Sequence, residues 1–206
     1  MSNQVRSPSV RARATTAVLA VVFVVALAAC SSPPPALYTI APVPGQTQAN
    51  GPKVVVLRDI ALARYLQREQ IVRSSDGYRL DVMSNDWWGE PLSAMLARVL
   101  VDELNQRLPQ STVLRESGAV AAPADATIEI NIERLDEDAS GKLVLSAQAI
   151  VEFQDRRVPQ PRSFRFVVPT PSRDTPGEVA AISTAVGQLA DGLASMLAAR
   201  PPTKGR

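Results

Sequence analysis

Strict alternation of apolar and polar residues marks the second half of the chain. Within residues 126–135, Ile128, Ile130 and Ile132 alternate with two glutamates and an asparagine. Residues 143–153 and 162–168 repeat this pattern, and the connection between the first two segments is polar and contains Gly141. A period of two is typical of strands that bury one face. The pattern therefore predicts an antiparallel hairpin followed by a third strand.

Two other segments have helical spacing. After Glu90-Pro91, apolar residues recur at intervals of three and four up to Leu104, and Pro109 ends the pattern; proline suits the first helical turn. Residues 175–178 read as a capping box, with Thr as the N-cap, and they open an amphipathic pattern that ends near Arg200. A coiled coil is the weaker interpretation of this second helix, because its pattern spans under three heptads.

The first half of the chain is less regular. A β-branched run over 53–60 predicts a buried strand, whereas residues 41–52, with three prolines and two glycines, predict a loop. Shorter strands are predicted at 38–40, 70–73, 78–83 and 111–115, the middle two as a hairpin. Strands, a helix, more strands and a second helix predict one α+β domain: a mixed, largely antiparallel sheet with two amphipathic helices packed on it.

The N-terminus has the pattern of a secretory signal. Three arginines precede the apolar run 17–29, whose 13 residues would cover about 20 Å as a helix, too short for most membrane spans. The run ends in Leu27-Ala28-Ala29-Cys30, which looks like a bacterial lipobox and predicts lipidation of Cys30. An ordinary signal peptide that contains a Cys, or an uncleaved anchor, is the alternative.

This interpretation divides the chain into four parts. They are a signal peptide (1–29), a lipidated Cys with a proline-rich tether (30–36), the α+β domain (37–200) and a disordered tail (201–206). Ser31 follows the Cys, where Asp usually retains lipoproteins of Gram-negative bacteria in the inner membrane. We therefore expect, for a Gram-negative source, an outer-membrane lipoprotein whose domain faces the periplasm.

The composition of the chain argues against several classes of function. The full chain has 22 Lys and Arg, 20 Asp and Glu, no His and one Cys. The signal peptide removes three arginines and no acidic residue, so the net charge of +2 becomes −1, and nucleic acid is not an expected partner. Without His, a Ser-His-Asp triad and a His-ligated metal are excluded.

Sequence motifs for catalysis are also missing. The chain has no glycine-rich phosphate-binding motif and no nucleophile elbow. The acidic run 136–138 lacks the alternating ligand spacing of a calcium loop, and we expect a solvated hairpin turn there. We therefore expect no enzyme activity, no cofactor and no metal.

Two segments are candidates for contact with a partner. Trp87 and Trp88 precede the first helix, and one of them is expected to cap the core while its neighbour lies on the surface. The alternative, functional interpretation is that the exposed Trp anchors a partner protein or lipid. The segment 61–66 contains Arg64, Tyr65 and Leu66 and reads either as a plain loop over the core or as an exposed recognition loop.

Several short motifs together resemble a known family. They are Tyr38-Thr39-Ile40, Tyr65-Leu66, Gln70-Ile71-Val72-Arg73 and Asp86-Trp87-Trp88-Gly89-Glu90-Pro91-Leu92, leading into Arg98-Val99-Leu100. In this order after a lipobox they resemble the PqiC-type ABC-transport auxiliary lipoproteins, which accompany MCE-domain lipid transport systems. The similarity covers residues 36–199, although its C-terminal half matches in pattern more than in identities.

The resemblance implies a non-catalytic protein at the outer membrane. It would dock the periplasmic MCE protein of an ABC-type lipid transporter and so support lipid transport and envelope integrity. It leaves a homo-oligomeric ring open as the assembly. The alternatives from other classes are a periplasmic lipid carrier, which needs a cavity between sheet and helices, and an activator of a cell-wall enzyme.

Overall fold

The alternating segments pair as their pattern predicts. In this computed structural model, which describes residues 33–74, 77–116, 123–155 and 159–199, three long strands form successive antiparallel hairpins: β7 (Ala126–Glu137), β8 (Lys142–Phe153) and β9 (Gln160–Pro169). On its other side β7 pairs in parallel with β2 (Val54–Leu57) and β3 (Ala61–Leu62), and β2 pairs with β6 (Thr112–Arg115). The result is a six-stranded mixed sheet in the order β6-β2-β7-β8-β9, with β3 beside β7.

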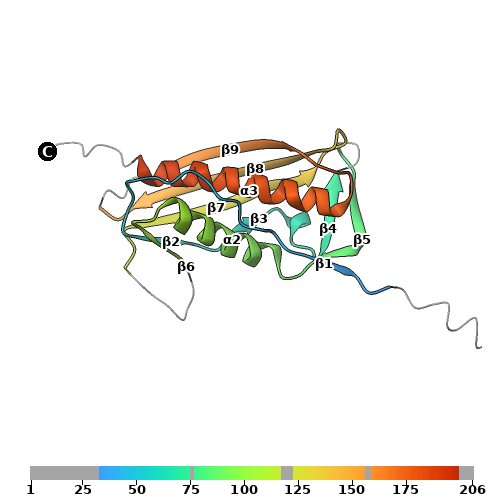
Figure 1. Ribbon diagram of the computed structural model, residues 1–206, viewed down its shortest axis with the longest axis horizontal. Coiled ribbons are helices and arrows are strands. Elements are labelled where there is room, and N and C mark those ends of the chain that lie inside the picture. Colours follow the sequence, from blue (N-terminus) through green and yellow to red (C-terminus); the bar gives the residue numbers. More distant parts are fainter. Residues whose placement is uncertain (1–32, 75–76, 117–122, 156–158, 200–206) are drawn as a thin grey trace, which may run out of the picture. The chain divides into compact units, whose positions relative to one another are not determined.

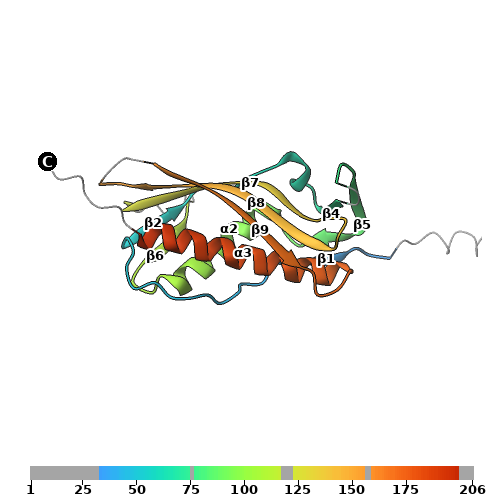
Figure 2. The same cartoon turned by 90° about the horizontal axis from the view of Figure 1, so that it is seen from above.

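Both helices cover one face of this sheet, as the two views show (Figure 1, Figure 2). The long helix α3 (Thr175–Ala198) packs on β7, β8 and β9, and α2 (Leu92–Arg107) packs on α3 and β6. The isoleucines of β7 and the alternate apolar residues of β8 face the helices and are buried. Burial of the apolar faces of sheet and helices in one core is the main stabilising force of this layered arrangement. The predicted α+β class is confirmed.

A second, three-stranded sheet stands at one end of the molecule. It consists of β1 (Ala36–Tyr38), β4 (Gln70–Ser74) and β5 (Leu80–Trp88) in the order β1-β5-β4, and the short 3₁₀ helix η1 (Arg64–Leu66) precedes β4. The predicted hairpin is present as β4 and β5, but β1 begins two residues earlier than predicted. β1 pairs in parallel with the end of β5, and the paired residues lie 50 positions apart in the sequence. No local sequence pattern could therefore have predicted this pairing.

The start of α3 differs by one residue from the predicted capping box. Asp174 is the N-cap, and its carboxylate accepts a hydrogen bond of 3.0 Å from the backbone N–H of Gly177. Thr175 is the first helical residue, and Glu178 does not reach back to the cap because its side chain is buried against Arg73. A carboxylate cap also complements the positive end of the helix. Similarly, Pro91 is the N-cap of α2 instead of its first residue.

The acidic run at the end of β7 is not the solvated turn that its composition predicted. Asp136 and Glu137 belong to the strand and are buried, and only Asp138 lies in the turn, where its carboxylate accepts hydrogen bonds from Ser140 and Lys142. The prediction failed because buried partners elsewhere in the fold compensate these charges, and local composition does not show them.

The predicted loop 41–52 crosses the helical layer and is held by a buried arginine. Arg107 contacts Asp191 at 2.6 Å and donates hydrogen bonds to the carbonyls of Val43 (3.1 Å) and Gly187 (3.0 Å). A Cβ atom at Gly45 would lie 2.3 Å from this guanidinium, so a side chain at that position would displace it. The loop is therefore fastened to both helices.

The described residues from Pro35 onward form one compact unit. Within the part of the chain that the structure describes, no helix is both long and apolar enough to cross a membrane. The predicted signal peptide, Cys30 and the tail 201–206 lie outside the described residues.

Candidate functional site

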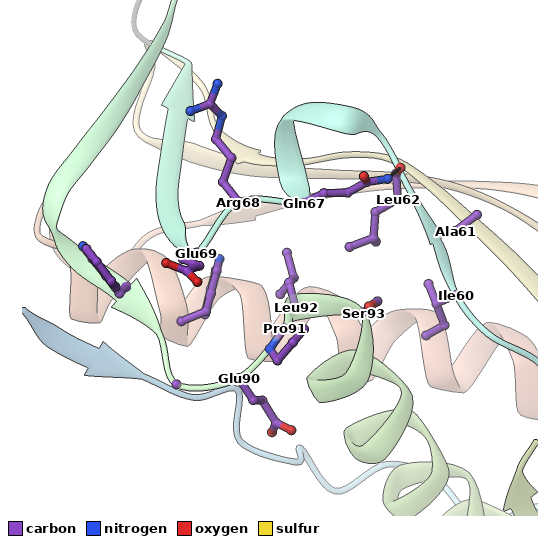
Figure 3. A pocket seen from close by; sticks show the side chains of 13 residues that line it. Ile60, Ala61, Leu62, Gln67, Arg68, Glu69, Glu90, Pro91, Leu92 and Ser93 are labelled. Carbon is purple, nitrogen blue, oxygen red and sulfur yellow. Dashed lines mark hydrogen bonds between the residues drawn. The ribbon is translucent and has the colours of Figure 1, made fainter. Parts of the chain in front are cut away.

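A surface cavity of about 730 Å³ opens where the two sheets meet the start of α2. We call it the junction pocket, and it is lined by residues 60–62, 67–69 and 87–93. These segments come from β3, from the connection between η1 and β4, and from the end of β5 with the first turn of α2 (Figure 3). Three regions distant in sequence therefore share one concave surface.

Backbone hydrogen bonds position the walls of the pocket. The N–H of Trp88 donates to the carbonyl of Glu69 (2.7 Å), which ties β5 to the segment before β4. The N–H of Gly89 donates to the carbonyl of Tyr38 (2.9 Å), so β1 supports the turn into α2. The chain then enters α2 at Pro91, whose fixed φ suits a helix start. The pocket is thus built on paired backbone and not on a free loop.

The interior of the pocket is apolar and its rim is charged. Leu62 and Leu92 point into the space between β3 and α2, whereas Arg68 and Glu90 point away from it on opposite sides (Figure 3). Glu90 is held in this position by Arg98, at 2.7 Å. A pocket with an apolar floor and a polar rim suits an inserted apolar side chain with polar contacts around it, the common arrangement of protein interfaces.

Two of the residues that the sequence singled out line this pocket. Trp88 is buried, 8% exposed, and belongs to the hydrophobic core, while its neighbour Trp87 is half-buried and its indole N–H donates to the carbonyl of Ser84 at 3.0 Å. This division between a core tryptophan and a more accessible one agrees with the expectation from the sequence. As a contact residue for a partner, Trp88 is therefore a poor candidate, because the core already covers it.

The other three candidate residues lie in η1, beside the pocket but outside its lining. Leu66 is buried in the core, so the interpretation of 61–66 as an exposed recognition loop that offers Tyr65, Leu66 and Arg64 together is wrong. Tyr65 is half-buried, and its hydroxyl donates a 2.5 Å hydrogen bond to Asp136; burial and this carboxylate raise the pKa of Tyr65. Of the three, only Arg64 is exposed.

Sequence reasoning missed several residues of the pocket. Ile60, Leu62 and the polar run Gln67-Arg68-Glu69 face the cavity or its rim. A signal for the polar run was present, because it separates two of the family-like motifs and interrupts apolar segments on both sides. Ile60 and Leu62 lie in segments that the sequence marks as a buried strand (53–60) and a candidate recognition loop (61–66), but their place in the pocket depends on the parallel pairing of β3 with β7.

A buried ionic cluster lies next to this region, between the three-stranded sheet and α3. Arg73 of β4 contacts Glu178 at 2.6 Å and lies 3.8 Å from Glu137. Burial raises the pKa of Glu178 to about 7, although Arg73 acts in the opposite direction. One oxygen of each of these two carboxylates has no hydrogen-bond partner. Two buried acids therefore share one arginine.

Another buried carboxylate lies under the loop 41–52. Glu103 of α2 accepts a 2.7 Å hydrogen bond from the backbone N–H of Val43, and burial raises its pKa to about 7. This group fastens the loop to α2. Over the described ranges, no cluster of three or more His, Cys, Asp or Glu side chains is arranged to hold a metal ion.

Solved structures show the same fold. A crystal structure of an uncharacterized protein superposes with a TM-score of 0.69 at 17% identity, covering 80% of this chain and 99% of the other. Protein XCC0632 from Xanthomonas campestris superposes with a TM-score of 0.64 at 20% identity, covering 79% and 94%. The PelC dodecamer from Paraburkholderia phytofirmans is more distant, with a TM-score of 0.44 and 14% identity over 79% and 99% of the two chains. At these identities the similarity concerns the fold alone.

No curated protein matches the sequence. Residues 38–194, however, match the family described as "ABC-type transport auxiliary lipoprotein component". The match includes every segment that lines the junction pocket and all elements of the fold except the start of β1 and the last turn of α3. The chain belongs to this family of PqiC-like auxiliary lipoproteins of ABC-type transport.

Proposed function

We propose that the protein is anchored in the outer membrane through Cys30 and docks the periplasmic MCE component of an ABC-type lipid transporter. The family match over residues 38–194 is the observation that supports this proposal. It assigns an auxiliary role in ABC-type transport, and the lipobox with Ser31 favours the outer membrane. In this proposal the protein is not an enzyme, and docking supports lipid transfer and the integrity of the envelope.

The junction pocket is the surface that we assign to docking. It combines an apolar floor with Arg68, Glu69 and Glu90 at its rim, a composition that suits a protein partner. It is also framed by the segment 86–92, one of the motifs that carries the family resemblance. A half-buried tryptophan at such a site is a common energetic centre of an interface.

A lipid carrier is less well supported. Such a carrier needs an apolar cavity between the sheet and the helices, but the side chains of α3 that face the sheet are almost fully buried against it. Mass spectrometry of lipid extracted from the purified protein would detect a carried lipid. A stoichiometric lipid in addition to the N-terminal acyl chains would favour this second function.

Capture of the MCE protein encoded beside this gene tests the docking proposal. Full-length lipidated protein in vesicles should retain the MCE protein, and Trp87→Ala should weaken retention at least about tenfold. Arg68→Glu reverses a charge at the rim and should weaken retention about threefold, mainly by slowing association. The matched control is Arg165→Glu, because Arg165 lies on β9, outside the pocket. Failure of the wild-type protein to retain the MCE protein would refute the proposal.

Stability must be measured in the same experiment. Trp87 is half-buried, so its removal affects packing, whereas Arg68 is exposed and its substitution should leave the thermal unfolding temperature unchanged. If both variants are folded and still bind like the wild type, docking uses another surface. Cys30→Ala tests the anchor separately: the protein should then leave the outer-membrane fraction.

A further inference from the structure

The large apolar side chains that remain exposed are concentrated at one end of the molecule. Among the described residues six large hydrophobic side chains are exposed, and four of them belong to the three-stranded sheet or its hairpin turn. They are Leu37 (66% exposed), Tyr78 (92%), Leu80 (44%) and Val82 (42%). Clustering of this kind marks a surface that contacts something other than water.

Three of these residues lie close together in the sequence, on β5 and in the turn before it. Leu80 and Val82 flank Asp81 in the strand, so their side chains project from the same face of β5, and Tyr78 lies in the turn two residues before Leu80. Arg79 and Asp81 form an ion pair at 3.1 Å, which limits the net charge of the strand. We call Tyr78, Leu80 and Val82 the hairpin patch.

The patch also lies along an incompletely paired strand. β4 pairs with one side of β5 along most of its length, but β1 pairs only with Asp86–Trp88 on the other side. Within the described residues, the first half of β5 therefore has a partner on one side only. An exposed, apolar strand of this kind is usually covered in the functional state.

The start of the chain indicates what covers it. Five residues separate Cys30 from Ala36, which limits the distance between them to about 20 Å. Because β1 pairs with the end of β5, the tether joins the domain at the same small sheet that carries Leu80 and Val82. The six steps from Leu80 to Asp86 also span about 20 Å of strand. A bilayer that holds an acylated Cys30 is thus within reach of the hairpin patch.

We propose that the hairpin patch inserts into the headgroup region of the bilayer that holds the lipid anchor. Tyrosine at the turn and the aliphatic residues on the strand suit this zone, where an apolar body is buried and a polar tip stays hydrated. The contact adds buried apolar area to the acyl anchor and fixes the orientation of the domain on the membrane. This inference rests on lipidation of Cys30, which is part of the proposed function.

Fluorescence quenching in vesicles tests the insertion. The sole native Cys is blocked by its lipid in the mature protein, so Tyr78→Cys provides a single thiol for an environment-sensitive fluorophore. The labelled, lipidated protein is placed in phosphatidylethanolamine–phosphatidylglycerol vesicles that contain a lipid with a nitroxide on its acyl chain close to the headgroup. The matched control is Val167→Cys, since Val167 is similarly exposed (48%) but lies on β9 of the six-stranded sheet.

We expect quenching at Tyr78→Cys to be at least about threefold stronger than at Val167→Cys, as for a segment buried at the membrane interface. Val82→Cys, in the same patch, should behave like Tyr78→Cys. Equal quenching at the patch and the control would overturn the proposal. Two further results would overturn it. Oxidation of unlabelled Tyr78→Cys to a disulfide-linked dimer would indicate that a second copy of the chain covers the patch. Protection of the fluorophore from water only when the MCE protein is present would indicate that the MCE protein covers it.

The outcome can be separated from that of the docking proposal. Mass spectrometry of the same sample establishes whether Cys30 is acylated, and retention of the MCE protein by the unlabelled protein reports docking. If the protein is acylated and retains the MCE protein but shows no quenching at the patch, the insertion alone is refuted.

Discussion

The two sheets of this protein are attached to the rest of the fold by different interactions. The six-stranded sheet packs through apolar side chains, among them Ile128, Leu145 and Leu189, which are fully buried between sheet and helix. The three-stranded sheet contributes Ile71 and Trp88 to the same core, but its contact with α3 is mainly polar: Arg73 contacts Glu178, and Thr175 donates to Asp86 at 2.6 Å. The first attachment should tolerate changes in pH, and the second should respond to them.

This difference has a functional consequence. Both surfaces that we assign to partners, the junction pocket and the hairpin patch, include residues of the sheet that is held by the polar contacts. Local stability varies within a protein, and regions with fewer buried apolar contacts open more easily. We therefore expect the six-stranded sheet with α3 to open less readily than the three-stranded sheet.

The largest effect is expected in the apolar body. Leu189→Ala removes a fully buried side chain of α3 and should lower the free energy of unfolding by about 2–5 kcal/mol. Urea unfolding followed by circular dichroism measures this change. The matched control is Leu80→Ala, at a residue that is 44% exposed, which should change stability by less than about 0.5 kcal/mol. Equal effects of the two substitutions would contradict the assigned core.

Removal of the arginine from the ionic cluster should have the next largest effect. Arg73→Met leaves Glu178 and Glu137 buried without their cation and should cost about 2 kcal/mol at pH 8, less than for fully buried pairs because a fifth of the arginine side chain is exposed. Hydrogen exchange should accelerate in β4 and β5 more than in β8. The control Arg98→Met breaks the exposed pair with Glu90 and should cost under about 1 kcal/mol. Uniform acceleration in both sheets would remove the distinction between them.

The dependence of stability on pH should also differ between the two attachments. The pKa of Glu178 is about 7 in the folded protein, against an ordinary value of 4.5, so folding takes up a proton between these two values. The stabilising contribution is complete below about pH 4.5 and is lost as the pH rises through 7. The slope for one such group is at most about 1.4 kcal/mol per pH unit. Glu178→Gln should flatten the dependence of the unfolding free energy on pH between 5 and 7.

Glu103 titrates over the same range, because burial also raises its pKa to about 7. The double variant Glu103→Gln/Glu178→Gln should therefore be flatter than either single variant. Glu129→Gln, at an exposed carboxylate that pairs with Arg58, is the matched control and should keep the wild-type slope. A wild-type slope in Glu178→Gln would show that this carboxyl does not titrate in the assigned range.

The smallest effect concerns one hydroxyl group. Thr175→Val keeps the shape of the side chain but removes the hydroxyl that donates to Asp86 and accepts a 3.2 Å hydrogen bond from Arg73, and it should cost about 1 kcal/mol. Thermal unfolding of Thr184→Val provides the control, since Thr184 lies on the exposed side of the same helix and bonds only its own backbone carbonyl at Ala180. If both substitutions have the same effect, Thr175 does not connect the sheet to α3.

Prediction from the sequence succeeded where one local pattern decided the structure. The isoleucines of β7 follow a period of two, and the apolar residues of α2 a helical period, so each element could be predicted before its partner was known. The same reasoning failed at Asp136, Glu137 and Glu178. These acids looked solvated or free to cap a helix, yet the fold buries them near Arg73 or Tyr65, which lie far away in sequence.

The candidate site was only partly predictable for the same reason. Trp87 and Trp88 were recognised because adjacent tryptophans are conspicuous, and the segment 86–92 carries the family resemblance. The run 67–69 was not recognised, and Ile60 and Leu62 were not assigned to a pocket, because these residues reach the junction pocket through the pairing of β3 with β7 and through the contact between Glu69 and Trp88.

The sequence by itself therefore determined the elements, the fold class and the predicted lipid attachment, because hydrophobic period, turn residues and the lipobox all act over short stretches of chain. Only the tertiary structure decided which charged residues are buried and which residues surround the junction pocket. It also decided that the exposed apolar side chains of β5 lie on the same small sheet as β1, the strand that follows the tether. These properties depend on contacts between segments tens of residues apart, and burial, which changes the energy of every charge, exists only after those contacts form.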